Sequence, residues 1–585
     1  MLAATVAISV PGEAVALSDY RNGELAHPKT RFALKSWNNR PQWEQHKSRL
    51  RRQILGSAGL LPEPQRDPVS VYTIRRTRHD RYSTQSLRIE TLPGLLVGAT
   101  VYHPNDTTKR WPGVLLPHGH WKRGRVENLP SYSVPALGIN LAMQGYVAIA
   151  WDMLGYNDTS TISHDFSGWR EQLWAFNPMG LQLWNSIRVT DYVLSRPDVD
   201  PRRLGCTGAS GGATQTILLT AVDSRITCSA PVNMVSGSYQ GADPCEEAPN
   251  LRLGTNNVEF ASMMAPRPML LVSCTGDWTR NTPGVEYPAI QRVYKLYNRA
   301  DLVTNAHFDA EHNYDRRTRS AVYRFLGKYL MNDQGLEWVE PDIPEINDEE
   351  LLAPPAGLPA NVRPIAYPEL FEQWRAVSRR QTESASLAAL RMALASSLMV
   401  ENPRPVGNST FGDRVLLNRI GKHDRIPAKW TRGSGIPAIL VHPDGSQAAA
   451  ATPEYKRLCD ADRPILALDV FQTGLAAVPR EKGGRWYLSY NQTDDANRIQ
   501  DIVTAISWVR SQNSVSPELI GLGRAALWVL FAAAVTPGNL SVVADIDVLK
   551  IEEDVLREGC MVPGIQRAGG IAGARKLVRN LRAKL

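Results

Sequence analysis

The stretch that decides the fold is Arg203-Leu204-Gly205-Cys206-Thr207-Gly208-Ala209-Ser210-Gly211-Gly212, which the small and apolar run 213–222 follows. Its first five residues predict a buried strand, and the run after Gly212 predicts a helix. Between them lies a G-x-S-x-G motif, which in a strand–turn–helix setting places its serine on a sharp turn. Glycines flank that serine because side chains there would collide with the neighbouring strand and helix. The pattern predicts Ser210 as a nucleophile at the start of a helix.

Further apolar segments surround this motif. Short apolar runs at 113–117, 146–151, 269–273 and 302–308 predict buried strands, and 181–194 has helical spacing. Near-continuous apolar strands separated by helices indicate a mostly parallel sheet with helices on both faces. The predicted fold class is therefore α/β.

The 585 residues are too many for one ordinary domain. We expect a lead-in segment over 1–95, an α/β domain over 96–335, and a linker with a helical connector over 336–404. Residues 405–585 repeat the strand and helix pattern in the same order, as in Pro437-Ala438-Ile439-Leu440-Val441-His442 against 113–118. This predicts a second, degenerate, non-catalytic copy of the sheet fold, although any two parallel α/β domains share some of this texture.

A serine nucleophile needs a base to take its proton at neutral pH. Between Ser210 and the linker the sequence has two histidines. His307 falls inside a predicted strand, whereas His312 lies in a polar loop before a helix, where a base of this architecture belongs. We therefore predict His312 as the base.

The base in turn needs an acid that orients it. Asp277 follows the predicted strand 269–275, and it completes the chain order Ser, Asp, His. Asp309 and Glu311 are the alternatives, since they lie close to His312 in sequence. We predict Asp277 as the orienting acid.

The negative oxygen of an acyl-transfer intermediate needs backbone donors. We predict the backbone N–H of Gly211, next to the serine, as one of these donors. The loop Pro117-His118-Gly119-His120-Trp121 follows an early strand and predicts the other, from the backbone of His120 or Trp121. Two close histidines could indicate a metal, but no third ligand has suitable spacing, so we predict no metal and no cofactor.

Together these motifs resemble the α/β-hydrolase superfamily, in particular its acetyl xylan esterase-like bacterial branch. The resemblance covers about residues 40–335, half of the chain, and its motifs are 118–120, 151–156, 188–200, 208–212, 276–277 and 311–314. It implies an α/β-hydrolase fold and a serine carboxylester hydrolase that deacylates a plant-type polysaccharide or oligosaccharide. Glucuronoyl esterases look related, but they carry an arginine just before the nucleophile, where this chain has Ala209.

Flat aromatic side chains stack on sugar rings. Trp121 and Trp278 adjoin the predicted catalytic motifs, and Trp169 precedes the G-x-S-x-G motif in a segment long enough to cover the site. We predict these three as substrate-binding residues, although most tryptophans serve ordinary core packing.

Two other functions compete with the esterase. A peptidase of the prolyl oligopeptidase type would carry a β-propeller, and no blade repeat is visible. A binding or scaffold protein would work through its second domain, which offers a G-x-G-x-x-A at 521–526. That motif could bind a dinucleotide, but we interpret it as a decayed nucleophile turn, because no acidic residue lies suitably after it and no histidine follows His442.

Net charge and hydropathy limit which partners and which cellular location are plausible for the protein. The net charge of +8 arises from the residues before 113, which include 17 Lys and Arg but 9 Asp and Glu. No nucleic-acid-binding signature accompanies this basic surplus. No apolar run reaches the roughly 18 residues of a membrane span. An apolar stretch at 2–10 and Ala14-Val15-Ala16 favour an extracytoplasmic over a cytoplasmic location, although no Lys or Arg precedes them. The six cysteines form no CxxC pair, and the oligomeric state stays open.

Overall fold

The computed structural model describes residues 18–333, 337–343, 347–403, 405–481, 483–512, 515–546 and 551–582. The expected export segment, at 2–10 and 14–16, lies outside these ranges. Backbone contacts divide the chain into two compact units. The large unit comprises His27–Ser167 and Phe176–Trp374, and the small unit comprises the residues up to Ala26, Gly168–Ala175 and those from Arg375 onward. Each unit is described by itself.

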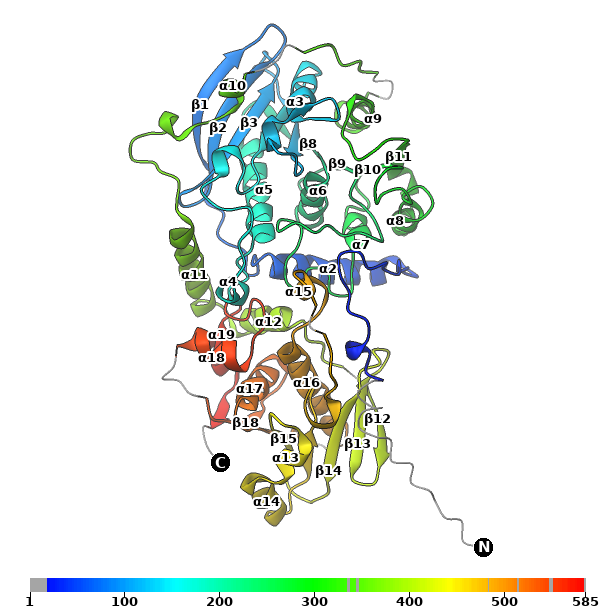
Figure 1. The fold of residues 1–585 in the computed structure, drawn as a ribbon, viewed down its shortest axis with the longest axis vertical. Coiled ribbons are helices and arrows are strands. Elements are labelled where there is room, and N and C mark those ends of the chain that lie inside the picture. The colour runs from blue at the N-terminus through cyan, green and yellow to red at the C-terminus, as the bar shows by residue number, and fades with distance from the viewer. Residues whose placement is uncertain are drawn as a thin grey trace. The chain divides into compact units, whose positions relative to one another are not determined.

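The large unit is built on a nine-stranded sheet in the order β1-β2-β3-β7-β4-β8-β9-β10-β11 (Figure 1). Its first three strands and the β3–β7 pair are antiparallel, and all other neighbours are parallel. The bounds are β1 (Ser70–Arg78), β2 (Ser83–Leu92), β3 (Leu95–His103), β4 (Trp111–Pro117), β7 (Val147–Trp151), β8 (Val199–Ala209), β9 (Cys228–Val232), β10 (Met269–Cys274) and β11 (Val303–Phe308). The predicted strands are confirmed, and β1 and β2 within the expected lead-in belong to the same sheet.

Helices cover both faces of this sheet. On one face α3 (Val134–Met143) and α9 (Arg316–Leu326) share a core cluster with Val114 and Leu116 of β4. On the other face Val193 of α5 (Pro178–Ser195) lies against Gly113, the residue before Val114. Successive strand residues point to opposite faces, so both faces of β4 are buried, as its continuous apolar sequence predicts.

The small unit has an eight-stranded sheet in the order β12-β13-β14-β16-β15-β17-β18-β19. Its strands are β12 (Val406–Phe411), β13 (Arg414–Arg419), β14 (Ile426–Thr431), β15 (Ala438–Val441), β16 (Ile465–Leu468), β17 (Glu518–Gly521), β18 (Ser541–Ala544) and β19 (Asn580–Arg582). Its helices include α12 (Leu387–Leu398), α16 (Asp494–Gln512) and α17 (Ala525–Val535), the last of which is buried along its whole length. The predicted second α/β fold is confirmed.

The N-terminal end of the described chain is part of the small unit. Arg21 is buried there, and its guanidinium donates hydrogen bonds to Asp501 of α16 at 2.6 Å and to Asp19 at 2.7 Å. Asp19 also accepts a hydrogen bond from the backbone N–H of Arg425 at 2.9 Å. A buried charge of this kind is tolerated only when it is paired.

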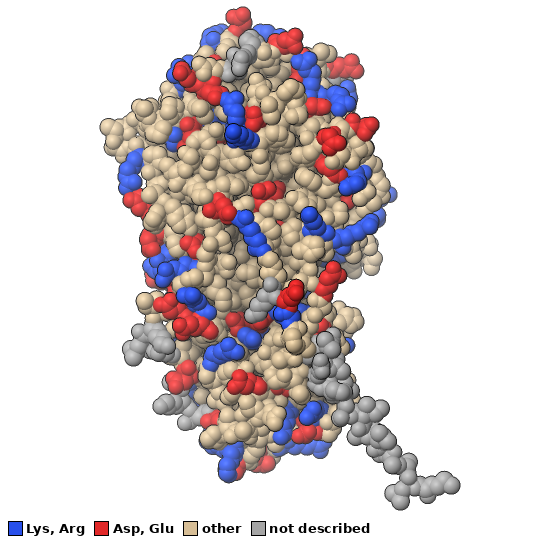
Figure 2. Space-filling view, in the orientation of Figure 1, with Lys and Arg blue, Asp and Glu red and all other residues tan. Residues whose placement is uncertain are grey.

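Two remaining expectations concern membranes and surface charge. None of the helices in the described ranges combines the length and the apolar character that a membrane crossing requires. On the face of the molecule in Figure 2, Lys and Arg are interspersed with Asp and Glu.

The described strands all fall in the two large sheets and one two-stranded sheet, β5 (Asn128–Leu129) with β6 (Tyr132–Ser133), so the β-propeller of the peptidase alternative is not among them.

Candidate active site

Ser210 lies on the turn between β8 and α6 (Gly211–Val222), as the motif predicts. Its backbone has φ 58° and ψ −125°, a conformation that costs a non-glycine residue free energy. The turn presses closely against the end of β4: a Cβ at Gly208 or Gly212 would lie 2.3 or 2.2 Å from the carbonyl oxygen of Pro117. The two glycines therefore allow the close approach that holds Ser210 on its strained turn.

Asp277 and His312 meet at the carboxyl ends of β10 and β11. Nδ1 of His312 lies 2.7 Å from Oδ2 of Asp277. The other carboxylate oxygen of Asp277 accepts hydrogen bonds from the backbone N–H and the hydroxyl of Thr279, at 2.6 and 2.5 Å. Burial by itself would raise the pKa of Asp277, but these hydrogen bonds outweigh it and lower the pKa below its usual value. Asp277 is thus held as an anion beside the imidazole.

The alternative residues have other partners. Asp309 accepts a hydrogen bond from the hydroxyl of Thr275 at 2.7 Å. Glu311 turns its carboxylate toward Gly276, where a Cβ would lie 2.6 Å from its oxygen. His307 lies within β11, and its Nδ1 is 2.8 Å from the hydroxyl of Ser273. Of the candidate acids, Asp277 is the one that His312 contacts by a hydrogen bond.

The serine turn is linked to the His312 loop through β9. The backbone N–H of Ser210 donates to the carbonyl of Val232 at 3.1 Å. The next residue, Asn233, donates its side-chain amide to the carbonyl of Asn313 at 2.9 Å. Nε2 of His312 is buried and has no hydrogen-bond partner among the described residues. Ser210 and His312 are thus not joined by a hydrogen bond in the structure, and contacts between a nucleophile and its base are often long before substrate binds.

The loop after β4 is fixed by His118. Its Nδ1 donates to the carbonyl of Gly119 at 2.8 Å, and its Nε2 accepts from the backbone N–H of Met153 at 2.9 Å. Burial lowers the pKa of His118 to about 3, so the ring is neutral and holds its loop in place. The backbone N–H of Gly119 donates to the hydroxyl of Tyr132 at 2.8 Å. His120 and Trp121 therefore remain the predicted donors from this loop.

The other predicted oxyanion donor is the backbone N–H of Gly211. Gly211 is the first residue of α6, where a backbone N–H has no acceptor within the helix. The same helix end carries a partial positive charge, which favours a developing anion.

Two of the three predicted tryptophans flank His312. The Trp121 ring is nearly parallel to the imidazole, with ring centres 5.6 Å apart, and stacks on Tyr132 at 3.6 Å on its other side. The Trp278 ring lies 4.7 Å from His312. Trp169 begins α4 (Trp169–Leu173) in the small unit, where Arg557 lies 4.8 Å over its ring. The structure therefore brings Trp121 and Trp278 to His312 but not Trp169.

A buried charge network supports the loops of the site, and the sequence pattern did not indicate it. Nε of Arg125 lies 2.9 Å from the carboxylate of Asp152, and both side chains are fully buried. Arg125 also pairs with Asp158. Burial, opposed by the Arg125 charge, raises the pKa of Asp152 to about 7. Asp152 belongs to the motif 151–156, but Arg125 and Asp158 are 27 and 6 residues away from it. Such spacings do not indicate a charge network in the sequence.

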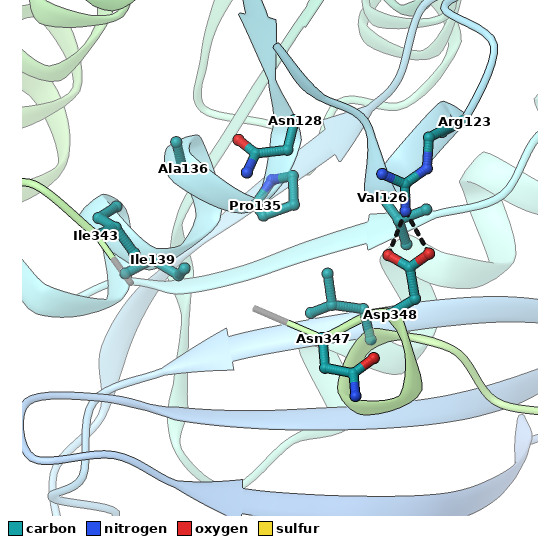
Figure 3. Close-up of a pocket in the computed structure, with 10 residues that line it drawn as sticks. Arg123, Val126, Asn128, Pro135, Ala136, Ile139, Ile343, Asn347 and Asp348 are labelled. Atoms are coloured by element: carbon teal, nitrogen blue, oxygen red, sulfur yellow. Dashed lines mark hydrogen bonds and ion pairs between the residues drawn. The ribbon is translucent and has the colours of Figure 1, made fainter. Parts of the chain in front are cut away.

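A cavity in the large unit lies apart from the predicted site residues. It has a volume of about 690 Å³, and its lining includes Val126, Ile139 and Ile343 with the ion pair of Arg123 and Asp348 (Figure 3). None of the predicted site residues lines it.

Comparisons with known proteins place the chain among hydrolases. No protein-family model matches it. It is 28% identical over 299 residues to "Putative hydrolase YtaP" of Bacillus subtilis (strain 168), a match that covers 48% of this chain and 98% of that protein.

Three solved structures to which it is similar are esterases by name. Methylesterase BT1017 is 27% identical with a TM-score of 0.47 and covers 60% of this chain and 78% of its own. An acetyl xylan esterase from Paenibacillus sp. R4 is 16% identical with a TM-score of 0.34, over 51% and 97% of the two chains. A glucuronoyl esterase from Solibacter usitatus is 14% identical with a TM-score of 0.40, over 52% and 98%.

The resemblance predicted from the sequence is confirmed, and so is the α/β-hydrolase fold, which the strand order and the serine turn show directly. The predicted class of enzyme, a carboxylic ester hydrolase, agrees with these relatives.

Proposed function

We propose that this carboxylic ester hydrolase removes acyl groups from a plant-type polysaccharide or oligosaccharide by means of Ser210, His312 and Asp277. The observation that carries the proposal is the 2.7 Å contact between Asp277 and Nδ1 of His312, on a histidine whose Nε2 is buried without a partner among the described residues. A histidine held in this way presents a lone pair at Nε2 and is ready to accept a proton.

In the proposed reaction, Ser210 attacks the ester carbonyl while Nε2 of His312 takes its proton. Asp277 keeps the other nitrogen protonated and stabilises the imidazolium. The backbone N–H groups of Gly211 and His120 or Trp121 bind the oxyanion. The C–O bond then breaks, and the sugar hydroxyl leaves with the proton from His312. Water, deprotonated by His312, attacks the acyl-enzyme and releases the acid and the free serine.

Aromatic side chains support a carbohydrate as the substrate. The rings of Trp121 and Trp278 lie 5.6 and 4.7 Å from the His312 ring, and Tyr239 lies 4.6 Å from Trp278. Aromatic faces of this kind contribute apolar area and stack on sugar rings. They would hold the sugar on which the scissile ester sits.

The test is hydrolysis of p-nitrophenyl acetate by the wild type and Ser210→Ala, followed by acetate release from acetylated xylan. We expect Ser210→Ala to lower kcat on the order of 10⁶-fold, because the nucleophile is removed. Ser195→Ala is the matched control, since Ser195 is exposed and bonds only its own helix. Near-wild-type turnover in Ser210→Ala, with an unchanged circular dichroism spectrum, would overturn the mechanism. Turnover of the activated ester without acetate release from xylan would overturn the deacetylation.

A further inference from the structure

Three loops of the large unit bring two histidines and a cysteine together beside the serine turn. His120 follows β4, His164 follows β7, and Cys245 lies between β9 and α7 (Asn257–Ser262). One ring nitrogen from each histidine and Sγ of Cys245 all lie within 4.8 Å of one another. Nε2 of His120 is 3.1 Å from Sγ, and the two imidazole rings are 5.3 Å apart and nearly perpendicular. The three side chains thus converge on one point from different directions.

Both histidines are oriented as metal ligands are. Nδ1 of His164 donates to the carbonyl of Leu154 at 2.8 Å, which leaves Nε2 with a lone pair. That Nε2 is buried and has no hydrogen-bond partner in the described part of the chain. Nδ1 of His120 lies 3.5 Å from the carboxylate of Asp243, and its Nε2 faces Cys245. Metal-bound histidines typically donate their second nitrogen to a carbonyl or a carboxylate. His164 donates to a carbonyl, and a carboxylate lies near the second nitrogen of His120.

The third group is a buried thiol. Cys245 is 1% exposed. Metal binding requires a thiolate and a neutral imidazole, so an ion that binds here displaces protons. A cation that entered the cluster would replace the thiol proton and use the unpaired nitrogen of His164.

We propose that His120, His164 and Cys245 bind one Zn²⁺ ion, with Asp243 orienting His120 and the fourth position open to water. Two imidazoles and one thiolate form a donor set that suits zinc, whereas Ca²⁺ and Mg²⁺ require oxygen ligands. Ligand atoms on one tetrahedral zinc ion lie about 3.3–3.6 Å apart, so binding requires side-chain shifts of about 1 Å or less. On binding, the thiol gives its proton to solvent and the thiolate forms the Zn–S bond.

The ion would act as a clamp on the loop that carries His120. The His120 ring lies against Gly211, where a Cβ would come within 2.3 Å of the ring carbon Cε1. A zinc ion on His120 therefore ties the β4 loop to the loops of His164 and Cys245, right next to the first residue of α6. Sequence spacing could not reveal this site, because His164 and Cys245 are 44 and 125 residues from His120.

The binding experiment uses the full chain, freed of metal by chelation and then titrated with Zn²⁺ or Co²⁺. We expect one Zn²⁺ per chain by elemental analysis after dialysis. Co²⁺ in the same site should give the near-ultraviolet absorption band of a cobalt–thiolate bond. Cys245→Ser should abolish that band, and His164→Ala should weaken Zn²⁺ binding by 100-fold or more. The controls are Cys459→Ser, an exposed cysteine of the small unit, and His307→Ala, whose ring is bonded to Ser273.

Two results would overturn the proposal. One is a stoichiometry that Cys245→Ser and His164→Ala leave unchanged while their circular dichroism matches that of the wild type. The other is Co²⁺ binding to the wild type without a thiolate band. Titration of Ser210→Ala separates this proposal from the esterase function, since that variant lacks the nucleophile but keeps all three ligands. A metal-binding Ser210→Ala beside a wild type without esterase activity would uphold the zinc site and reject the function.

Discussion

The two units share one strand order and differ in the elements that come after their shared strands. The order β12-β13-β14-β16-β15-β17-β18-β19 matches β1-β2-β3-β7-β4-β8-β9-β10 position by position, with the same antiparallel and parallel neighbours. In the described residues of the small unit, β11 has no counterpart. Because β11 leads into the loop of His312, the described part of the small unit has no counterpart of the element that carries the predicted base.

The serine turn itself has a close counterpart. Gly521 ends β17 and corresponds to Gly208: a Cβ there would meet the carbonyl oxygen four residues on at 2.6 Å, against 2.7 Å for Gly208. Two residues later stand Gly523 and Ser210, with φ of 54° and 58°. The geometry therefore makes Gly523 the counterpart of Ser210.

The comparison shows that the backbone conformation of the turn does not depend on the presence of a serine. The strand–turn–helix connection keeps its positive φ in both units because a helix must leave the end of a strand within very few residues. In the large unit that strain is borne by a serine, whereas in the small unit a glycine adopts a similar φ at no cost. The G-x-G-x-x-A pattern at 521–526 is accounted for by this turn.

The first prediction, which has the largest expected effect of those that follow, compares the loss of a buried aspartate in each unit. Asp277→Asn should lower kcat for p-nitrophenyl acetate by about 10⁴-fold, because an amide favours the wrong tautomer of His312. Asp469→Asn is the matched change in the small unit, where Asp469 is buried and accepts hydrogen bonds from the N–H and hydroxyl of Ser446 at 2.6 and 2.8 Å. It should leave kcat per folded molecule unchanged. Equal losses in both variants would mean that catalysis depends on both units.

Much of the fold was predictable from the sequence because buried parallel strands carry continuous apolar runs. The strand β4 is such a case, because the apolar run at 113–117 falls within its bounds. Strands β1 and β2 were missed for a physical reason. They are antiparallel, β1 has no fully buried residue, and β2 mixes polar with apolar residues along Ser83–Leu92, so their hydrophobic signal is weak.

For the site, chain order predicted more than local pattern did. Ser210, Asp277 and His312 each follow a strand, and parallel strands gather their carboxyl ends on one edge, so the contact between Asp277 and His312 could be foreseen. Trp169 shows the limit of this reasoning. It lies between two elements of the large unit in sequence, yet it packs within the small unit, since a segment of eight residues, Gly168–Ala175, belongs there. Contacts over long sequence separations leave no local signal.

The second prediction tests whether the small unit is independent of catalysis. Arg21→Ala should lower the free energy of unfolding by about 3–5 kcal/mol, because Asp501 is left as a buried and unpaired carboxylate. Esterase kcat per folded molecule should not change. Lys456→Ala, which removes an exposed ion pair with Asp460 in the same unit, is the control and should leave stability nearly unchanged. Denaturant unfolding together with turnover measures both effects, and a loss of kcat in Arg21→Ala would show that the units are coupled.

The third prediction is a pH dependence of stability. Burial, opposed by the charge of Arg21, raises the pKa of Asp501 to about 6 from the usual 3.8. Between these values the folded state binds more protons than the unfolded state, so this contribution to stability is full below about pH 4 and is lost as the pH rises through 6. The unfolding free energy of the wild type minus that of Asp501→Asn should fall by about 2–3 kcal/mol between pH 4 and 6. A difference that rises or stays level over this range would contradict the assignment.

The smallest expected effect comes from exchanging the two turn residues. Gly523→Ser places a side chain at φ 54° and should cost about 1–2 kcal/mol of stability, while Ser210→Gly should relieve a similar strain in the large unit. Denaturant unfolding measures both changes, which should be opposite in sign. In a Ser210→Ala background, Gly523→Ser should restore no ester hydrolysis, because no histidine follows His442 in the sequence to stand where His312 does. Hydrolysis that returned with Gly523→Ser would show that the small unit can still assemble an active site, and the contrast between a working turn and a purely structural one would fail.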